Sequence, residues 1–438
     1  MKKYVIFSLI LFVNLLFFVA CNKSQVSKSQ VSKIIPSNNP PAIIDSNYIS
    51  NKTTYFNVKN DTIYGEGKET LKKIFQESQF VIYGEKHNSK ETAKLIAALI
   101  PMMNNYSYNS LCLEIGPHSA SKVNELIKPF DKTVENIKQF NSAYYRKEFD
   151  DVPIPFMSGI EDAKFLANAS KYNMNIWGLD QEYFYSILYL TDQLLKEAID
   201  NENYKEIQSS KQKADEAILK WFKFANDSEK EVPIFEKFLN DADVISFFKS
   251  VNNVSPKASE IITDIKLSWD IYTRWRTGSH ADRISYMRNN FMKNYEAESQ
   301  NNQAPKVFLK FGAVHASQIL SLGTYDLGHL LNELASKNNT KCTNINSWTR
   351  YYLEDGKEVD YLTEYKKHYE RLKRFMNFAK RDEWAIIDLE SIRADVKNNK
   401  IALPKDGDFH KLNSLIQGYD YQFILPVDQY ITDNIEGK

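Results

Sequence analysis

The chain has 438 residues, of which 43% are hydrophobic and 26% are charged. A chain of this length and composition folds around a sizeable apolar core, which excludes an intrinsically disordered protein. Lysine plus arginine and aspartate plus glutamate number 56 each, so the charge balance gives no sign of a nucleic-acid-binding surface and we expect no nucleic-acid partner.

The N-terminus has the three-part pattern of a secretory signal. Lys2 and Lys3 precede an apolar run that ends before Cys21, and this run is short for a membrane span, which needs about 20 residues. The motif "FFVAC" resembles a bacterial lipobox, in which the cysteine becomes the lipidated first residue, although Phe18 stands where leucine is usual. We expect a signal peptide over residues 1–20 and a lipid anchor on Cys21, with an uncleaved membrane anchor as the alternative.

The next segment, residues 21–54, is predicted to be a flexible tether. It repeats Ser, Gln, Lys and Asn, contains several prolines, and has too few large apolar side chains to bury a core. Residues 55–438 are then expected to form the folded domain.

Apolar runs that stop at glycine or polar residues recur along that domain. They predict strands at residues 79–85, 110–116, 174–180 and 306–315, with weaker candidates at 342–348 and 383–389. Helical patterns lie between them at 89–103, 164–172 and 183–200. This alternation predicts an α/β fold with a mostly parallel sheet flanked by helices. The charged segment at about 200–300 is predicted to be a helical insertion between the third and fourth strands.

Acidic and histidine side chains follow the ends of the four main strands. Glu85 and His87 follow the first strand, Glu114 closes the second, Asp180 follows the third, and His315 follows the fourth. Ligand sites in open α/β sheets form at the carboxyl ends of the strands, so we expect these groups to share one pocket.

This set of side chains suits two kinds of chemistry. A neutral imidazole with a pKa of about 6.5 can take a proton from water, and a carboxylate beside it can orient the ring and stabilise its charged form. The same groups could instead hold a divalent metal ion, with Glu85, His87, Glu114 and His315 as ligands. A structural interpretation also stays open, because Glu85 could simply begin the following helix.

Five short motifs in this order resemble the erythromycin esterase-like family and its ChaN-type and Tiki-type relatives. They are "GEKH", "LEIG", "GLD", "RISYMRNNF" and "FGAVH", and the resemblance spans roughly residues 80–334. It implies an α/β domain in which His87 activates water for ester hydrolysis without a metal, with Glu85 and Glu114 lining the same pocket. It also implies that Arg283 clamps a carboxylate or phosphate of the substrate, and that His315 is the histidine of the last motif.

Two departures move the sequence from the macrolide esterases towards the wider superfamily. Asn88 follows the first histidine where the esterases usually have glycine, and the last motif contains one histidine where they usually have two. No GxSxG, P-loop, GxGxxG or HExxH pattern offers a competing mechanism.

The sequence therefore predicts an exported lipoprotein hydrolase, anchored to a bacterial membrane on its periplasmic or cell-surface face. We expect it to cleave an ester or related bond in a small-molecule or peptide substrate without a cofactor. Two alternatives stay open: a non-catalytic haem- or iron-binding lipoprotein of ChaN type, and a metal-dependent peptidase of Tiki type. The candidate catalytic residues are His87, Glu85, Glu114 and His315, and the candidate substrate-binding residues are Asp180 and Arg283.

Two further cysteines, Cys112 and Cys342, lie within or beside predicted strands. Export would permit a disulfide between them. Two buried thiols are the favoured interpretation, because sequence alone provides no geometry for a bridge.

The expected lipid anchor leads to a first prediction. Replacing Cys21 with serine should release the protein from the membrane fraction, because the acylated thiol would be lost. Fractionation of cells that express the parent and Cys21→Ser checks this. Unchanged membrane retention with an intact N-terminus would instead identify an uncleaved anchor.

Overall fold

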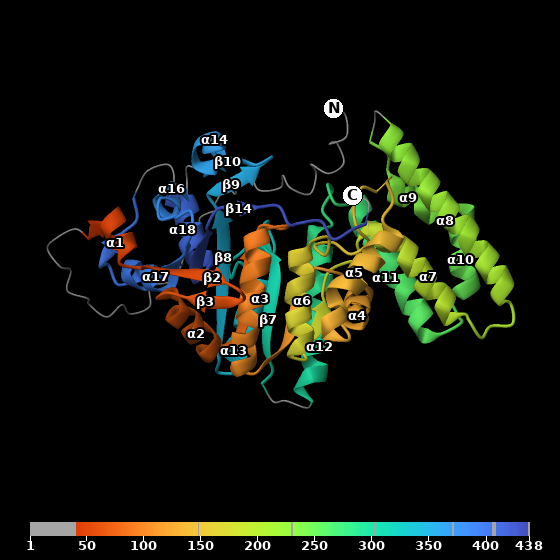
Figure 1. Cartoon of the computed structure of the whole chain (residues 1–438), viewed down its shortest axis with the longest axis horizontal. Coiled ribbons are helices and arrows are strands. Elements are labelled where there is room, and N and C mark those ends of the chain that lie inside the picture. Colours follow the sequence, from red (N-terminus) through yellow and green to blue (C-terminus); the bar gives the residue numbers. More distant parts are fainter. Residues whose placement is uncertain are drawn as a thin grey trace, which may run out of the picture.

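The computed structural model describes residues 41–147, 149–228, 231–300, 304–369, 372–404 and 409–436. The expected signal peptide, Cys21 and the expected tether up to residue 40 lie outside these ranges. A large sheet runs through the middle of the described protein, with strand order β3-β2-β11-β13-β8-β4-β7-β5-β6 (Figure 1).

Five of the six strands predicted from the sequence form the centre and one edge of this sheet. They are β4 (Ser78–Glu85), β5 (Tyr108–Leu113), β6 (Asn175–Gly178), β7 (Lys306–Gly312) and β8 (Lys341–Thr349). These strands are parallel to one another, and β13 (Tyr421–Leu425) pairs parallel with β8 and antiparallel with its other neighbour. The opposite edge is antiparallel and consists of β11 (Trp384–Asp388), β2 (Thr53–Lys59) and β3 (Thr62–Tyr64). The predicted fold class, a mostly parallel α/β sheet, is confirmed.

Alternating residues of the central strand face two separate cores, as the two-residue period of a strand requires. Val81 and Tyr83 pack with helices on one side, whereas Phe80 and Ile82 pack with helices on the other. The first side is covered by α2 (Gly67–Glu77), α3 (Lys90–Asn105), α4 (Pro117–Leu126), α5 (Thr133–Tyr144) and α6 (Ile160–Lys171). The second is covered by α12 (His280–Ser299) and α13 (Leu327–Lys337). Every residue of β4 is buried, which explains its nearly continuous apolar run.

The predicted helical insertion lies between β6 and β7 and forms the right-hand part of Figure 1. It follows η3 (Phe184–Ser186) and α7 (Ile187–Glu197), and leads into α12. Phe238, Phe247 and Trp269 are almost fully buried within it, and they continue the apolar core that contains Val81 and Tyr83. Its helices are α8 (Tyr204–Asp227), α9 (Ile234–Asn240), α10 (Ala242–Val251) and α11 (Pro256–Thr273).

The folded part begins earlier than residue 55. Ile44 and Ile49 are each 1% exposed and belong to a third apolar core, so residues 42–54 of the expected tether pack against the domain. The segment contains β1 (Ala42–Ile43), which pairs with β12 (Ile401–Ala402), and α1 (Ser46–Ser50). The same core includes α16 (Lys373–Met376), α17 (Leu389–Lys397) and α18 (Phe409–Gly418).

A small three-stranded sheet, of order β10-β9-β14, lies above the upper end of β8 in Figure 1. Its strands are β9 (Tyr351–Glu354), β10 (Lys357–Asp360) and β14 (Asp428–Gln429), followed after β10 by α14 (Tyr361–Glu364) and α15 (Lys366–Tyr369). β14 joins the C-terminal segment to this sheet by a parallel pairing with β9.

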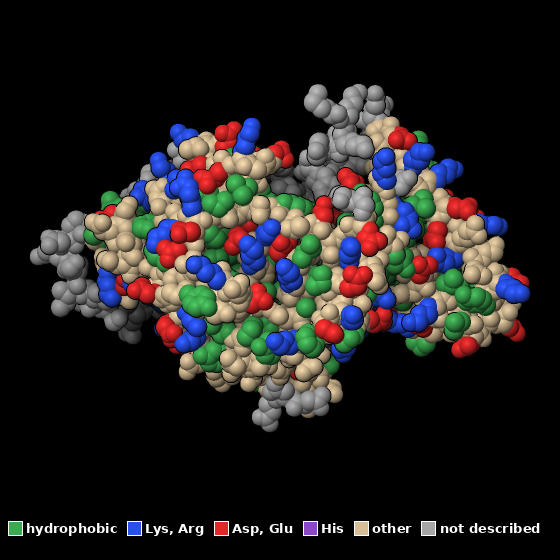
Figure 2. Space-filling view, in the orientation of Figure 1, with side chains coloured by type: hydrophobic (Ala, Val, Ile, Leu, Met, Phe, Trp, Pro, Cys, Tyr) green, Lys and Arg blue, Asp and Glu red, His purple; other side chains and the backbone are tan. Residues whose placement is uncertain are grey.

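Acidic and basic side chains are intermixed over the face drawn in Figure 2. Among the helices of the described ranges, none is both long and apolar enough to span a membrane. Cys112 and Cys342 are both buried free thiols, which is the interpretation favoured from the sequence.

Candidate active site

The predicted site residues meet at the carboxyl edge of the main sheet. Glu85 is the last residue of β4, and Glu114 follows β5 directly. Asp180 lies two residues after β6, and His315 lies in η4 (Ala313–Ala316), the short helical turn after β7. Because these strands are parallel neighbours, their ends lie together and bring these side chains into contact with one another.

Glu85 fixes the orientation of the His87 ring. His87 Nδ1 lies 3.0 Å from Glu85 Oε1, which also accepts a hydrogen bond from the buried Lys310 Nζ at 2.6 Å. Burial opposes ionisation of Glu85, but Lys310 and His87 outweigh burial and lower the pKa of this carboxyl. An ionised Glu85 only accepts hydrogen bonds, so this contact favours the tautomer of His87 that carries its proton on Nδ1.

Glu114 is the centre of the site. Its Oε2 accepts a hydrogen bond from the Gly312 backbone N–H at 2.6 Å, and its Oε1 accepts one from Arg283 Nη2 at 2.8 Å. His87 Nε2 lies 3.5 Å from Oε2, and His315 Nε2 lies 3.3 Å from Oε1. Burial again favours the neutral acid, yet His315, His87 and Arg283 hold the pKa of Glu114 well below its usual range.

Gly312 allows this close approach. A Cβ atom at this position would lie 3.0 Å from His87 Nε2 and 3.4 Å from Glu114 Oε2. A larger residue would therefore crowd the one nitrogen that Glu85 leaves available, so glycine keeps the space beside Nε2 open.

His315 is enclosed by two carboxylates. Its Nδ1 lies 2.8 Å from Asp326 Oδ2, while its Nε2 faces Glu114. Burial lowers the pKa of His315, but Asp326 and Glu114 outweigh it and raise the pKa to about 10. His315 is therefore an imidazolium at neutral pH, and both of its N–H groups are directed at carboxylates. Asp326 also caps α13, because its Oδ1 accepts a hydrogen bond from the Leu327 N–H at 2.7 Å.

Arg283 connects α12 to two strand ends. Its Nε donates to Asp180 Oδ1 at 2.9 Å, and its Nη2 donates to both Asp180 Oδ2 and Glu114. Burial disfavours the charged guanidinium, but Asp180 and Glu114 raise the pKa of Arg283 well above its usual range. Two carboxylates thus hold Arg283 in place, because the planar guanidinium can donate to both at once.

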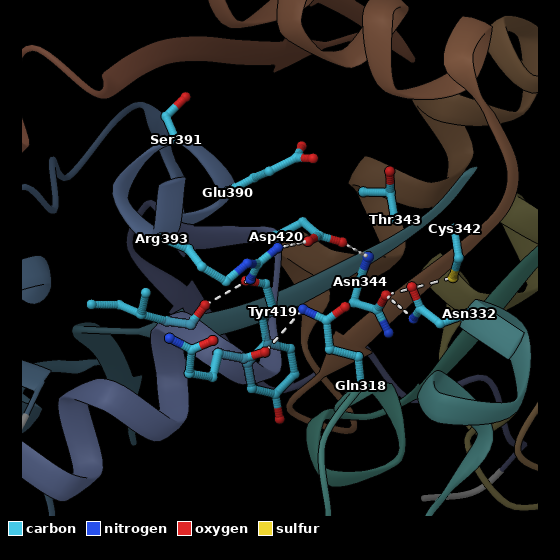
Figure 3. Close-up of polar contacts among 12 residues, drawn as sticks. Gln318, Asn332, Cys342, Thr343, Asn344, Glu390, Ser391, Arg393, Tyr419 and Asp420 are labelled. Atoms are coloured by element: carbon cyan, nitrogen blue, oxygen red, sulfur yellow. Dashed lines mark hydrogen bonds and ion pairs between the residues drawn. The ribbon is translucent and has the colours of Figure 1, made fainter. Parts of the chain in front are cut away.

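Asn344 and Asp420 belong to a buried polar network (Figure 3), and this network is connected to the turn that carries His315. Asn344 in β8 donates from its side chain to the Ala316 carbonyl at 2.8 Å, and its backbone N–H donates to Asp420 at 2.9 Å. Tyr419 donates from its hydroxyl to the Ala313 carbonyl at 2.8 Å. Both ends of η4 are therefore attached to β8 and to the residues before β13.

The residue between Glu85 and His87 points to a different partner. Lys86 Nζ lies 3.8 Å from the centre of the Tyr352 ring and donates to the Tyr361 hydroxyl at 3.1 Å. Burial lowers the pKa of Lys86, while Asp428 and Glu354 oppose that change. The "GEKH" motif thus serves the site through its first and last side chains and attaches the small sheet through its lysine.

Two surface segments enclose His87. The Phe156 ring stacks on the His87 ring, with 4.0 Å between centroids and an interplanar angle of 15°. Residues 428–436, here called the C-terminal strap, cross both neighbouring loops and can be followed as the blue trace from β14 in Figure 1. The Ile431 N–H donates to the Asn88 carbonyl at 3.2 Å, and the Asn434 N–H donates to the Ser158 carbonyl at 2.7 Å.

The donor set does not fit a divalent metal ion as these side chains are placed. Within the ranges that the structure describes, no three His, Cys, Asp or Glu side chains are arranged to hold one. The oxygens of Glu85 and Glu114 already accept hydrogen bonds, from Lys310 and from Arg283 and the Gly312 N–H respectively. Both nitrogens of His315 face carboxylates. The reaction derived below therefore uses no step through a metal.

The sequence predicted six residues of this site but missed three others. These are Lys310, Asp326 and Phe156, which contact Glu85, His315 and His87 only in the folded chain. A lysine inside the apolar run "KVFLKFG" was a usable signal for Lys310, because a buried lysine needs an acidic partner. An aspartate before the apolar helix "LGHLL" was a usable signal for Asp326.

The double pairing of His315 leads to a stability prediction. His315→Ala should lower the free energy of unfolding by about 3–5 kcal/mol at pH 6, because two buried carboxylates lose their shared cation. The raised pKa makes this stabilisation complete below about pH 6.5 and lost as the pH rises through about 10. Urea unfolding at pH 6 and pH 10 should show the deficit of the variant shrinking. His329→Ala, a partly exposed histidine of α13, is the control, and an equally small effect of both variants would contradict the prediction.

The C-terminal strap leads to a third prediction. Ile431 is 4% exposed, so Ile431→Ala should cost about 2–5 kcal/mol of stability and loosen the strap. Hydrogen exchange should quicken at the Ile160 amide, which donates to the strap at Thr432. Ile199→Ala, at an isoleucine that is 62% exposed, should leave exchange there unchanged. Protection of Ile160 that survives Ile431→Ala would show that the strap does not hold this loop.

No family model matches the chain, and no curated protein matches it in sequence. Solved structures do match it in fold. A histidine-to-asparagine variant of erythromycin esterase EreC in its open conformation is 14% identical, covers 87% of this chain and 98% of its own, and has a TM-score of 0.50. A Bacillus cereus protein is 13% identical, with 89% and 98% covered and a TM-score of 0.51.

A succinoglycan biosynthesis protein is also similar, at 13% identity, with 88% of this chain and 96% of its own covered and a TM-score of 0.50. The likeness to ChaN of Campylobacter jejuni has a TM-score of only 0.29 and supports no conclusion. At these identities the matches establish architecture. The resemblance predicted from the short motifs is confirmed at that level: this chain has the fold of erythromycin esterase EreC over most of its length.

Proposed function

We propose that this protein is a hydrolase that cleaves an ester or related bond with a water molecule activated by His87. One observation carries the proposal. The His87 side chain is 25% exposed, whereas its acidic partners Glu85 and Glu114 are 2% and 6% exposed. A base that solvent can reach is thus held between two buried carboxylates, which is the arrangement that general-base catalysis requires.

In the proposed reaction, the water oxygen attacks the carbonyl carbon while a water proton moves to His87 Nε2. The imidazolium that forms donates from Nδ1 to Glu85 and from Nε2 towards Glu114, so its charge is balanced on both sides. When the tetrahedral intermediate collapses, the carbon–oxygen bond to the leaving group breaks. The proton on Nε2 then passes to the leaving alkoxide, which restores the neutral base.

The negative charge that develops on the carbonyl oxygen needs a donor. Arg283 uses Nε and Nη2 for Asp180 and Glu114, and Nη1 makes no hydrogen bond to any residue in the described ranges. We assign the oxyanion, or a polar group of the substrate, to Nη1. His315 is then a positioning residue, because both of its N–H groups serve to hold Asp326 and Glu114.

The proposed substrate is a small molecule or a peptide that carries an ester or related bond. The fold shared with erythromycin esterase EreC supports this bond class. We further propose that the protein is exported and anchored through Cys21 to the periplasmic or cell-surface face of a bacterial membrane. This part of the proposal rests on the N-terminal sequence pattern alone.

The decisive variant is His87→Ala. It should lower kcat/KM on an ester panel by about 10²- to 10⁴-fold, which is the contribution of a positioned base. His87→Gln should not restore activity, because an amide cannot accept the proton. His329→Ala should retain full activity, since this histidine lies away from the set and contacts Gln318 and Tyr325. Thermal melting of all variants should confirm that each is folded.

Chelator treatment separates this proposal from the alternatives. Activity that survives chelation but falls in His87→Ala supports a metal-free base. Loss with chelator and recovery with an added divalent ion would indicate a metal-dependent peptidase or esterase. A purified protein that binds haem and turns over no ester or peptide would indicate a ChaN-type binder. Full activity in His87→Ala would overturn the proposed role of this histidine.

A further inference from the structure

Phe156 lies in a strained conformation directly on the proposed base. Its φ angle is 61°, in the left-handed region that side chains with a bulky Cβ substituent rarely adopt. Such a conformation costs of the order of the free energy of a hydrogen bond and persists only where the surroundings enforce it. Phe156 is also only partly buried, so its ring does not repay this strain by filling the core.

The surroundings that enforce this conformation are contacts of the C-terminal strap. Ser158, two residues after Phe156, accepts a hydrogen bond from the Asn434 N–H at 2.7 Å. Gly159 forms an antiparallel bridge with Asp433, and the Ile160 N–H donates to Thr432 at 2.8 Å. The loop is thus fixed immediately after the strained residue, by a segment from the far end of the chain.

The same strap fixes the other side of His87. Asn88, the next residue, has a φ of 59°, and its carbonyl accepts a hydrogen bond from the Ile431 N–H at 3.2 Å. Ser89 forms an antiparallel bridge with Tyr430. Two left-handed residues therefore flank the His87 ring, one in sequence and one in space, and a single segment holds both.

A hydrogen bond at one ring nitrogen leaves the plane of an imidazole free to pivot. Glu85 fixes Nδ1, and the Phe156 ring, at 4.0 Å and 15°, covers one face of His87. Together these contacts determine where Nε2 points, which is towards Glu114 and the open space at Gly312. The electron-rich face of the phenyl ring also favours an imidazolium over a neutral imidazole, as in cation–π contacts.

We propose that Phe156 is a positioning residue of the active site: it fixes the plane of the His87 ring and stabilises the imidazolium that forms when His87 takes the water proton. The inference deepens the proposed hydrolase function and rests on it. The C-terminal strap holds the loop of Phe156, and Phe156 in turn stacks on His87. The strap therefore acts on the proposed base through Phe156.

The test uses Phe156→Gly in the full-length chain, because glycine adopts a φ of 61° without strain. This variant should keep or raise the melting temperature, whereas a merely structural phenylalanine would be destabilising to remove. Its kcat should fall about 10-fold with little change in KM, which corresponds to the loss of a cation–π contact and of a fixed ring. Phe156→Leu should lower kcat by a similar factor, because it lacks an aromatic ring. Phe156→Trp, which keeps one, should retain most of the kcat of the parent.

A spectroscopic readout makes the result independent of turnover. The chain contains seven histidines, so ring-labelled histidine gives a simple NMR spectrum in which His87→Gln identifies the His87 signals. Stacking should shift the His87 ring protons upfield in the parent and in Phe156→Trp, and Phe156→Gly should abolish the shift. The parent should show one neutral tautomer with the proton on Nδ1, and Phe156→Gly should show a mixture.

Each outcome decides between the two proposals. A lost upfield shift with unchanged kcat and an unchanged tautomer would overturn the positioning role and leave the hydrolase intact. Absence of turnover in the parent would overturn the hydrolase, and the tautomer signals would then judge the positioning of His87 alone. An upfield shift that persists in Phe156→Gly would show that the ring does not lie on His87.

Discussion

A single buried carboxylate, Glu114, holds the candidate active site together. Its two oxygens receive the Gly312 N–H, Arg283 and the imidazolium of His315, and they face His87 Nε2. Burying an ionised carboxylate costs several kcal/mol unless cations and donors compensate for the lost hydration. The fold must therefore bring β5, β7, η4 and α12 to one point, and this requirement sets the geometry of everything around it.

Ion pairs fix most of the charged side chains at the site. Lys310 neutralises Glu85, and Arg283 is shared between Glu114 and Asp180. Asp326 and Glu114 keep His315 charged at neutral pH. The His87 side chain is 25% exposed and lies between Glu85 and Glu114, so in the proposed reaction the surrounding ion pairs act as a fixed frame for one proton transfer.

The parts of the chain outside the central sheet serve the same site from two directions. The helical insertion leads into α12 and so delivers Arg283, whose pairing with Asp180 connects the insertion to the end of β6. The C-terminal region contributes the small sheet, which binds Lys86, and the strap, which fixes the loops on both sides of His87. Segments far apart in the sequence thus meet at the short "GEKH" motif.

Local sequence patterns were sufficient for the architecture and for the residues that meet at the candidate site. The apolar run at 79–85 became β4, the helical pattern at 89–103 became α3, and the charged segment after β6 became the insertion. Strand polarity then brings Glu85, Glu114, Asp180 and His315 to one edge, because parallel strands end on the same side of a sheet. Of the antiparallel edge, β11 corresponds to the weaker candidate at 383–389. The strands β2 and β3 and the packing of residues 42–54 were not predicted, since short strands and short apolar segments carry little periodicity.

The state of each group was decided only by tertiary contacts. Lys310 reaches Glu85 because β4 and β7 pair in one register, with Tyr83 opposite Lys310. Asp326, at the start of α13, pairs with His315 and keeps it an imidazolium. Phe156 stacks on His87, and the strap forms hydrogen bonds to the loop immediately after Phe156. Sequence alone determined which residues could do acid–base chemistry. The folded chain determined which charges and donors surround each of their nitrogens and oxygens, because those partners lie far apart in the sequence and meet only in space.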